Sequence, residues 1–439
     1  MRNLLEGFIG IHSNGWNFAD KSGIFVPFGA NYFDPETGWA PKLWRMFNES
    51  RVKDHFSKMS DIGVNVARIF LTAASFQPES DSISKEALEK LDTMIDIAKQ
   101  KGIRLILTGP DHWEGRPDYW GSDKYAGETA LDALEFFWGE LASHYKDETA
   151  IFAWDLLNEP EIHWKSDIMA EKWQLWLQSK YEAWSKLAQE NIETATIPED
   201  KIDPGSQKLY DYQLFRESIA YEWTKRQVDS IRAVDNNHLI TVGFIQWSFP
   251  LLRAPWGGNA HQPGRYAAFN PLKLAPMLDF ICIHFYPILG DPGDPKLKLD
   301  NTQYLQAVTN YCYAGKPVVI EEFGWYGGGE MYGKFRTESY QSEWNTNAVE
   351  STMGLASGWI TWAFSDTPTS TDITKFGGLY SIEGNLKEWG KSFRSLSSRI
   401  IGSSRSDNFK IPGIDERMAL TGDVKVLYEK YLNESGIAL

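Results

Sequence analysis

The sequence predicts an α/β fold in which eight parallel strands, each followed by a helix, close into a (β/α)8 barrel. Three observations support this fold class. Short apolar runs alternate with amphipathic helical stretches along most of the 439 residues, as in βαβ units. Two of the apolar runs end in a glutamate that precedes a proline or Phe-Gly, so that a carboxylate lies where each strand stops. No internal repeat or low-complexity segment interrupts the pattern, and barrels with insertions often run this long as one domain.

The expected strands are short apolar runs bounded by turn residues. A run that is apolar on both faces is typical of a parallel strand, because helices cover one face and the barrel interior lies on the other. In chain order, the eight strands are predicted at residues 24–31, 64–70, 103–108, 151–159, 238–244, 279–287, 316–322 and 357–364.

Helical periodicity separates these runs. The stretch 84–101 is a clear amphipathic helix, and Gly102 is suited to end it. Residues 1–24 are expected to form a short hairpin or cap. Further helices are predicted at residues 51–62, 130–145 and 386–396.

The connection between the fourth and fifth strands is longer than a usual barrel loop. Residues 161–237 carry helical stretches at 167–190 and 209–234. They leave the fourth strand at its carboxyl end. We therefore expect a helical insertion that walls one side of the barrel mouth.

The predicted barrel domain spans residues 1–400 and includes this insertion. A C-terminal extension, residues 401–439, begins with a polar link at 402–407 and is expected to pack on the outside of the barrel with a helix at 424–432. The loop 246–275 is expected to form a second wall at the mouth. Its aromatic residues include Trp247, Trp256 and Tyr266.

The composition excludes several classes of function. A formal net charge of −15 argues against nucleic acid or an anionic membrane as a partner and is compatible with a neutral ligand such as a sugar. No metal-ligand spacing is present, and no cofactor is expected. The two cysteines, Cys282 and Cys312, are expected to be reduced structural thiols. No secretory signal or membrane-spanning run is visible, which predicts a cytoplasmic protein, or a secreted one if a leader was removed.

The run 151–159 ends in Asn158 and Glu159, and Pro160 stops the strand. The run 316–322 ends in two consecutive glutamates, Glu321 and Glu322. The carboxyl ends of parallel barrel strands meet at one mouth, so carboxylates from the two runs should converge there. Two carboxylates flanking a bond are what glycosidic cleavage needs. Side chains alternate along a strand, which predicts that only one of the consecutive pair faces the mouth.

Four other polar residues lie in predicted strands. Arg68 either orients a carboxylate at the mouth or forms an ion pair inside the barrel, because a buried guanidinium needs a carboxylate partner. His284 and Tyr286, two positions apart, share one strand face, which favours a functional role. Asn31 ends the first strand and either faces the mouth or caps a turn.

Residues 20–400 resemble glycoside hydrolase family 5, in the retaining barrel clan that includes cellulases, β-mannanases and β-mannosidases. The order of the motifs and their positions at strand ends carry the resemblance. In this sequence Gly109–Asp111 separate His112 from the predicted end of its strand, a departure from the family pattern. The motifs are Arg68, His112-Trp113, Asn158-Glu159-Pro160, His284-Phe285-Tyr286, Glu322-Phe323-Gly324 and Trp362.

The resemblance implies a role for each residue. Glu159 would be the general acid/base and Glu322, rather than Glu321, the nucleophile of a double displacement. Arg68 and Tyr286 would hold the nucleophile ionised and aimed. The remaining residues would bind substrate, with Asn158 on the 2-hydroxyl, Trp362 beneath the sugar, and His112, Trp113 and His284 around it.

The substrate expected from the resemblance is a β-mannoside cleaved from the chain end. The run Gly-Ala-Asn-Tyr in the first strand and the position of Trp113 look like mannan-active relatives. The long insertion favours a closed pocket. The alternative is an endo-acting β-mannanase or β-1,4-glucanase with an open groove. A sugar-binding barrel without catalysis would be expected to lack one glutamate, and here both are present.

Overall fold

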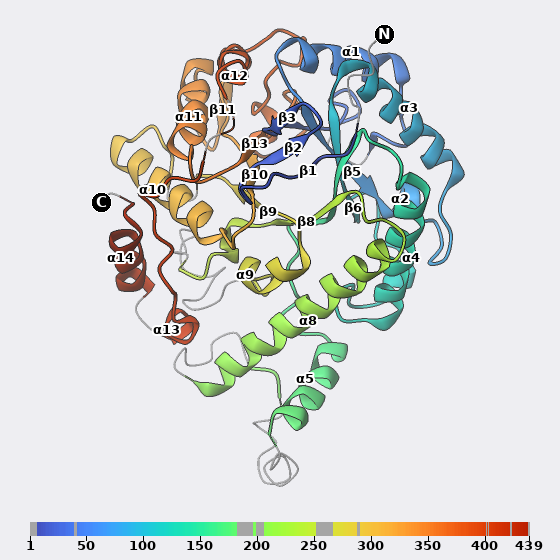
Figure 1. Ribbon diagram of the computed structural model, residues 1–439, viewed down its shortest axis with the longest axis vertical. Helices are drawn as coiled ribbons and strands as arrows, with labels where there is room; N and C mark the ends of the chain where they lie inside the picture. Colours follow the sequence, from blue (N-terminus) through green and yellow to red (C-terminus); the bar gives the residue numbers. More distant parts are fainter. Residues whose placement is uncertain are drawn as a thin grey trace.

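The computed structural model describes residues 7–38, 42–181, 196–198, 206–251, 267–287, 290–400, 402, 404–421 and 424–437. Eight parallel strands form a closed barrel in the order β10-β13-β4-β5-β6-β7-β8-β9. The predicted fold class is confirmed (Figure 1). The barrel strands are β4 (Phe28–Tyr32), β5 (Val66–Thr72), β6 (Arg104–Asp111), β7 (Ile151–Asn158), β8 (Leu239–Phe244), β9 (Ile281–Phe285), β10 (Val318–Phe323) and β13 (Gly358–Thr361).

Helices surround the barrel (Figure 1). The predicted helix at 84–101 is α3 (Lys85–Lys101). Its N-cap, Ser84, accepts a hydrogen bond from the Ala87 backbone, and Gly102 ends it in the left-handed conformation. The other helices of the ring are α1 (Glu49–Asp61), α2 (Ala73–Phe76), α4 (Glu128–Tyr145), α8 (Gln207–Arg232), α9 (Pro271–Leu274), α10 (Pro295–Tyr311), α11 (Glu338–Ser351) and α12 (Glu388–Ser397). Short elements complete the loops: η2 (Asp118–Trp120), η3 (Gln246–Ser248), η4 (Ala275–Met277), η5 (Ile373–Lys375), β11 (Gly329–Met331) and β12 (Lys334–Arg336).

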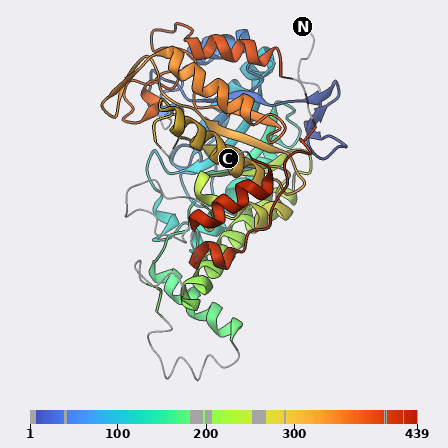
Figure 2. The same cartoon turned by 90° about the vertical axis from the view of Figure 1, so that its left-hand side faces the viewer.

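The amino-terminal end of the barrel is closed by a small antiparallel sheet, which lies in front of the barrel in Figure 1 and at its right-hand end in Figure 2. The ring of Phe18 lies 5.1 Å from that of Phe152 and 5.2 Å from that of Phe280, between centroids. This packed apolar floor leaves the carboxyl end of the strands as the mouth. The sheet consists of β1 (Gly10–Ile11), β2 (Phe18–Asp20) and β3 (Gly23–Phe25).

The insertion between β7 and β8 is helical. Its α5 (Asp167–Lys180) and the first half of α8 pack together, with the rings of Trp173 and Phe215 5.4 Å apart. They extend beyond the barrel at the lower end of both views (Figures 1 and 2). The second half of α8 lies along α4, where Arg226 forms ion pairs with carboxylates of that helix. Residues 182–195 and 199–205, which hold the rest of the predicted 167–190 helix and most of its turn, lie outside the described residues, as do Trp256 and Tyr266.

The C-terminal extension packs beside α10, at the left of Figure 1. It contains α13 (Glu416–Thr421) and α14 (Val424–Ser435). Asn310 of α10 donates hydrogen bonds to the Lys410 carbonyl at 2.7 Å and to the Tyr431 hydroxyl at 3.1 Å. These bonds and the tyrosine rings around them hold the extension against the barrel.

Two strand boundaries differ from the prediction. The strand β6 continues to Asp111, so Gly109–Asp111 are strand and not loop. The register between β5 and β6 shifts after Phe70, and such an irregularity leaves no mark on the apolar pattern. At the first strand, residues 24–25 belong to β3, and the barrel strand begins at Phe28.

Both cysteines, Cys282 and Cys312, are buried and free, as predicted. Burial raises the pKa of both thiols, so they remain protonated at neutral pH. Within the described residues, no helix has both the length and the apolar character that crossing a bilayer requires.

Candidate active site

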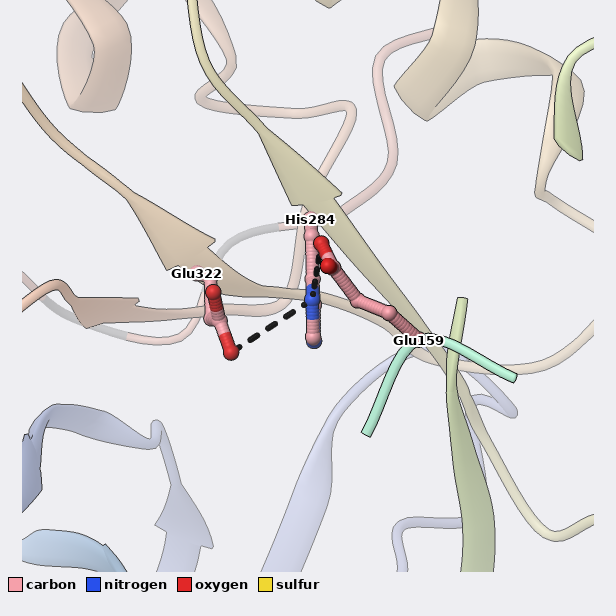
Figure 3. Close-up of side chains that lie close together, drawn as sticks. All are labelled: Glu159, His284 and Glu322. Carbon is pink, nitrogen blue, oxygen red and sulfur yellow. Dashed lines mark hydrogen bonds and ion pairs between the residues drawn. The ribbon is translucent and has the colours of Figure 1, made fainter. Parts of the chain in front are cut away.

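Glu159 and Glu322 meet at the mouth of the barrel. Glu159 directly follows β7 and has a left-handed backbone with φ +45°, while its N–H donates to the Gly243 carbonyl at 2.9 Å. Its side chain points across the mouth toward β9 and β10 (Figure 3). One carboxylate oxygen of each glutamate and one nitrogen of His284 all lie within 4.8 Å of one another. The two runs that the sequence singled out therefore bring their carboxylates together.

An irregularity in β10 turns two consecutive side chains inward. Its register with β9 shifts between Ile320 and Glu322, so strict alternation is lost. The Glu322 side chain, 5% exposed, lies at the mouth, and that of Glu321, 0% exposed, lies deeper in the barrel. The expectation that Glu322 faces the mouth holds. Only one of the two glutamates therefore faces the mouth, as expected, although both side chains point into the barrel.

Arg68 is fully buried and joins the side chains beneath the mouth. Its Nη1 donates to Glu322 Oε1 at 2.6 Å and to Asn31 Oδ1 at 3.1 Å. Its Nη2 donates to Asp155 Oδ2 at 2.7 Å and to Asn158 Oδ1 at 3.0 Å. Both interpretations of Arg68 therefore apply: it fixes the carboxylate at the mouth, and it compensates buried negative charge inside the barrel.

His284 and Tyr286 approach the carboxylates from one face of β9, as their spacing predicts. His284 Nδ1 lies 3.1 Å from Glu159 Oε1 and 3.5 Å from Glu322 Oε1. Its Nε2 lies 3.3 Å from Glu321 Oε2. The Tyr286 hydroxyl donates to Glu322 Oε2 at 2.7 Å. Each oxygen of Glu322 thus has its own donor, while His284 spans all three glutamates.

The surrounding charges set the protonation of these groups. Burial alone would lower the pKa of His284, but Glu322, Glu159 and Glu321 outweigh it and raise the pKa to about 10. At neutral pH His284 is therefore a cation that donates from both nitrogens. Burial raises the pKa of the Tyr286 phenol well above its usual value, so it keeps its proton and donates to Glu322.

The two neighbouring glutamates respond differently to burial. Burial raises the pKa of Glu322, although His284, Arg68 and the Tyr286 hydroxyl oppose the shift. Burial alone would also raise the pKa of Glu321, but Arg68 and His284 bring it below the usual value. Glu321, the deeper carboxylate, is therefore favoured in its ionised form. The ionised form of Glu322, at the mouth, depends on the groups that donate hydrogen bonds to it.

The spacing of Glu159, His284 and Glu322 also meets the distance requirement of a metal site. A metal ligand must offer a lone pair, whereas the raised pKa of His284 favours a ring that is protonated on both nitrogens, each within hydrogen-bond distance of a carboxylate. The arrangement therefore favours acid–base and nucleophilic chemistry over metal ligation.

Aromatic side chains border the same part of the mouth. Trp362 is 5% exposed, its Nε1 donates to Thr374 Oγ1 at 2.9 Å, and its ring lies 5.9 Å from that of Phe70. The half-buried ring of Trp113 lies 5.1 Å from Phe70 on the other side. These rings and Tyr286 form one cluster that can carry the C–H face of a sugar.

Asn158, at the end of β7, has a fixed orientation. Its Oδ1 accepts from Arg68, and its amide nitrogen has no hydrogen-bond partner among the described residues. That amide is therefore available to donate to a ligand at the mouth.

His112 lies apart from the glutamates, although β6 reaches the residue before it. Its side chain is 52% exposed, and Nδ1 lies 3.0 Å from Asp111 Oδ1. It borders a hollow of about 390 Å³, here called the β6–β7 hollow, between the loops that follow these strands. Its lining includes His112, Arg116, Lys124, Tyr125, Glu161, His163 and Trp164.

Three residues of the site were not assigned a role from the sequence. Asp155 accepts from Arg68 and from Thr108 at 2.7 Å, and burial together with Glu321 raises its pKa to about 6. An aspartate within an apolar strand was the visible signal for it. Gly243 gave no signal, yet a Cβ there would lie only 2.9 Å from Arg68 Nη2. The third is Asn31, which the sequence left between two interpretations.

The sequence matches the family model for cellulase, glycosyl hydrolase family 5, over residues 27–367. The chain belongs to glycosyl hydrolase family 5. It is therefore a glycoside hydrolase built on an eight-stranded barrel.

Curated relatives cover most of the chain. Mannan endo-1,4-beta-mannosidase A of Emericella nidulans is 23% identical over 391 residues, which is 81% of this chain and 80% of the relative. Mannan endo-1,4-beta-mannosidase A of Hypocrea jecorina is 22% identical over 412 residues, 88% of this chain and 76% of the relative.

Solved structures share the fold at lower identity. An exo-beta-1,4-mannosidase from Opitutaceae bacterium strain TAV5 superposes with a TM-score of 0.61 at 19% identity and covers 89% of this chain, which spans 62% of that structure. A GH5_18 variant from Streptomyces cattleya, in complex with Manβ1-4GlcNAc, superposes with a TM-score of 0.63 at 15% identity and covers 94% of this chain and 98% of its own.

Proposed function

We propose that this family 5 enzyme hydrolyses β-mannosides with retention of configuration, with Glu322 as nucleophile and Glu159 as general acid/base. The observation that carries the proposal is the approach of one oxygen of each carboxylate to within 4.8 Å of the other. Retaining glycosidases hold the two carboxyls about 5–5.5 Å apart, whereas inverting enzymes need about 6.5–9.5 Å to admit a water. The geometry fits the shorter separation.

The hydrogen bonds give each glutamate a distinct task. Glu322, held by Arg68 and Tyr286, attacks the anomeric carbon as the bond to the leaving oxygen breaks. Glu159, whose side chain is 30% exposed, gives its proton to that oxygen. A water then attacks the glycosyl–Glu322 ester, Glu159 takes its proton, and the sugar leaves. Asn158, with its amide free to donate, is placed to bond the 2-hydroxyl.

The choice of mannose as the sugar rests on the relatives, and the choice between exo and endo cleavage rests on the helical insertion. Both sequence relatives named above act on β-1,4-mannan, and one structural neighbour is an exo-mannosidase. The helical insertion that begins beside Glu159 favours cleavage from a chain end, so we propose exo action. The names of the sequence relatives favour the second candidate, an endo-acting mannanase.

One screen separates these candidates. The purified protein is incubated with p-nitrophenyl β-mannoside, p-nitrophenyl β-glucoside, mannopentaose and cellopentaose, and the products are followed by chromatography. Mannose released singly from mannopentaose, with the β-mannoside preferred over the β-glucoside, is expected. Mannobiose and mannotriose as first products would replace exo by endo action. Cleavage of the glucosides alone would overturn the mannoside assignment.

A further inference from the structure

The β6–β7 hollow has the composition of a sugar site. The Lys124 ammonium lies 5.1 Å from the ring centroid of Tyr125 and 3.5 Å from His112 Nδ1. Among the described residues it forms no ion pair with a carboxylate. Glu161 and Trp164 also line the hollow. A cation, a carboxylate and aromatic rings together match the hydroxyls and the C–H faces of a pyranose.

One wall of the hollow is formed by the segment that directly follows the general acid in the chain. Glu161 is two residues beyond Glu159, and its backbone N–H donates a hydrogen bond to the hydroxyl oxygen of Tyr125, 3.2 Å away on the wall of the hollow. A general acid faces the leaving oxygen, so the sugar attached to that oxygen must leave on its side. The volume of about 390 Å³ is enough for one pyranose ring.

We infer that the β6–β7 hollow binds the neutral pyranose of the leaving group, with Lys124 and Glu161 bonded to its hydroxyls. This inference rests on the proposed function. It also gives His112 a place, beside the leaving sugar rather than beside the sugar that is attacked.

The test compares two substrates in one variant. Lys124→Met should lower kcat/KM for mannobiose about tenfold more than kcat/KM for p-nitrophenyl β-mannoside, whose flat leaving group cannot use the lost hydrogen bond. The matched control is Lys180→Met, since Lys180 lies 4.6 Å from the Trp176 ring but outside the hollow. Its two values should keep their wild-type ratio.

An unchanged ratio in Lys124→Met, with an active wild type, would overturn this inference alone. A wild type inactive on both substrates would overturn the proposed function with it. Glu161→Gln is the second variant, and a lowered ratio there as well supports the same site.

A different observation concerns Asn31, whose side chain is completely buried beneath the mouth. Its Nδ2 donates to the Glu321 carbonyl at 2.9 Å and to the Thr361 carbonyl at 3.2 Å. Its Oδ1 accepts from Arg68 Nη1, the atom that also donates to Glu322. One amide therefore holds both the backbone irregularity before Glu322 and the guanidinium that binds its carboxylate.

We propose that Asn31 is a positioning residue for Glu322. Without its amide, the Glu321 carbonyl would lose a buried donor at the irregularity, and Arg68 would lose one of its anchors. Glu322 would then move relative to the anomeric carbon, and misplacement on the ångström scale costs up to about a hundredfold in rate.

The chain offers a matched control in Asn65. Asn65 Oδ1 accepts from the Phe28 N–H and Asn65 Nδ2 donates to the Val26 carbonyl, each at 2.8 Å, at the other end of the same strand. The side-chain amides of both asparagines thus form hydrogen bonds to the backbone at or beside a strand, but only Asn31 also contacts Arg68 of the site.

The readout is the rate at which 2,4-dinitrophenyl 2-deoxy-2-fluoro-β-mannoside labels the protein, followed by mass spectrometry. Asn31→Ala should slow labelling between about tenfold and a hundredfold, and Asn31→Ser, which keeps a short donor, should recover part of the rate. Asn65→Ala should lower Tm but label within about twofold of wild type. Equal labelling rates in Asn31→Ala and Asn65→Ala would overturn the proposal, and a wild type that is never labelled would overturn the role of Glu322 with it.

Discussion

Two layers of the barrel interior lie only two residues apart along the same strands, and their chemistry is opposite. On β7 the inward residue changes from Ala153 to Asp155, and on β9 it changes from Cys282 to His284. The lower layer joins the apolar floor under Phe18 and is stabilised by burial. The upper layer is equally buried but charged, so it is stable only because each carboxylate has a donor. Strand alternation selects which residues face inward, and pairing decides whether charges can stay there.

The largest expected effect comes from the upper layer. Glu322→Gln and Glu159→Gln should each lower kcat on p-nitrophenyl β-mannoside by at least about a thousandfold, because one removes the attacking oxygen and the other the base that activates water in the second step. Tm should change little, since glutamine keeps the side-chain volume. As the matched substitution in the lower layer, Phe152→Leu should shift Tm and leave kcat near wild type. Near-normal turnover in either glutamine variant would remove its assigned role.

Arg68→Met should damage stability and activity together. It leaves Asp155, Glu321 and Glu322 buried without their shared cation, and breaking a buried pair costs about 3–5 kcal/mol. Urea unfolding of the variant measures the loss. A change of under about 1 kcal/mol would mean that the charged layer does not depend on its cation.

Gly243→Ala should have an intermediate effect. The new Cβ would lie 2.9 Å from Arg68 Nη2 and 3.1 Å from His284 Nε2, so one of these side chains must move. Overpacking of this kind costs about 1–3 kcal/mol, and kcat should fall as well. The control is Gly10→Ala in β1, where nothing lies within 4 Å of an added Cβ. If the two variants lose the same stability and the same kcat, close packing against the charged layer is not the reason that position 243 requires a glycine.

The smallest effect is a pH dependence of stability. The pKa of His284 is raised from 6.5 to about 10 in the folded state, so its contribution is fully present below about pH 6.5 and is lost as the pH rises toward 10. As the pH rises between these values, the Tm of the wild type should fall more than the Tm of His284→Gln. The difference in Tm between the two proteins should therefore become smaller. A constant gap would contradict a cationic His284.

The sequence predicted the barrel because alternation of apolar runs and helices is a local property. It also found Glu159, Glu322, Arg68, His284 and Tyr286, since each is a polar residue in or at the end of an apolar strand. It did not show that Glu321 also points into the barrel, because the irregularity that turns it inward comes from the pairing of β10 with β9.

Two other features could not be read from single residues. The need for a glycine at position 243 arises from side chains of β5 and β9, which are distant in the chain. The three extra residues of β6, which put His112 directly after its strand, likewise depend on the register with β5. Contacts of this kind appear only when the barrel closes.

The configuration of the first product tests the central claim most directly. The protein is mixed with p-nitrophenyl β-mannoside inside an NMR tube, and the anomeric proton of the released mannose is followed before mutarotation. The close approach of Glu159 and Glu322 predicts β-mannose as the first sugar to appear. If α-mannose appears first, the two carboxylates do not act by double displacement, and the assignment of Glu322 as nucleophile is contradicted.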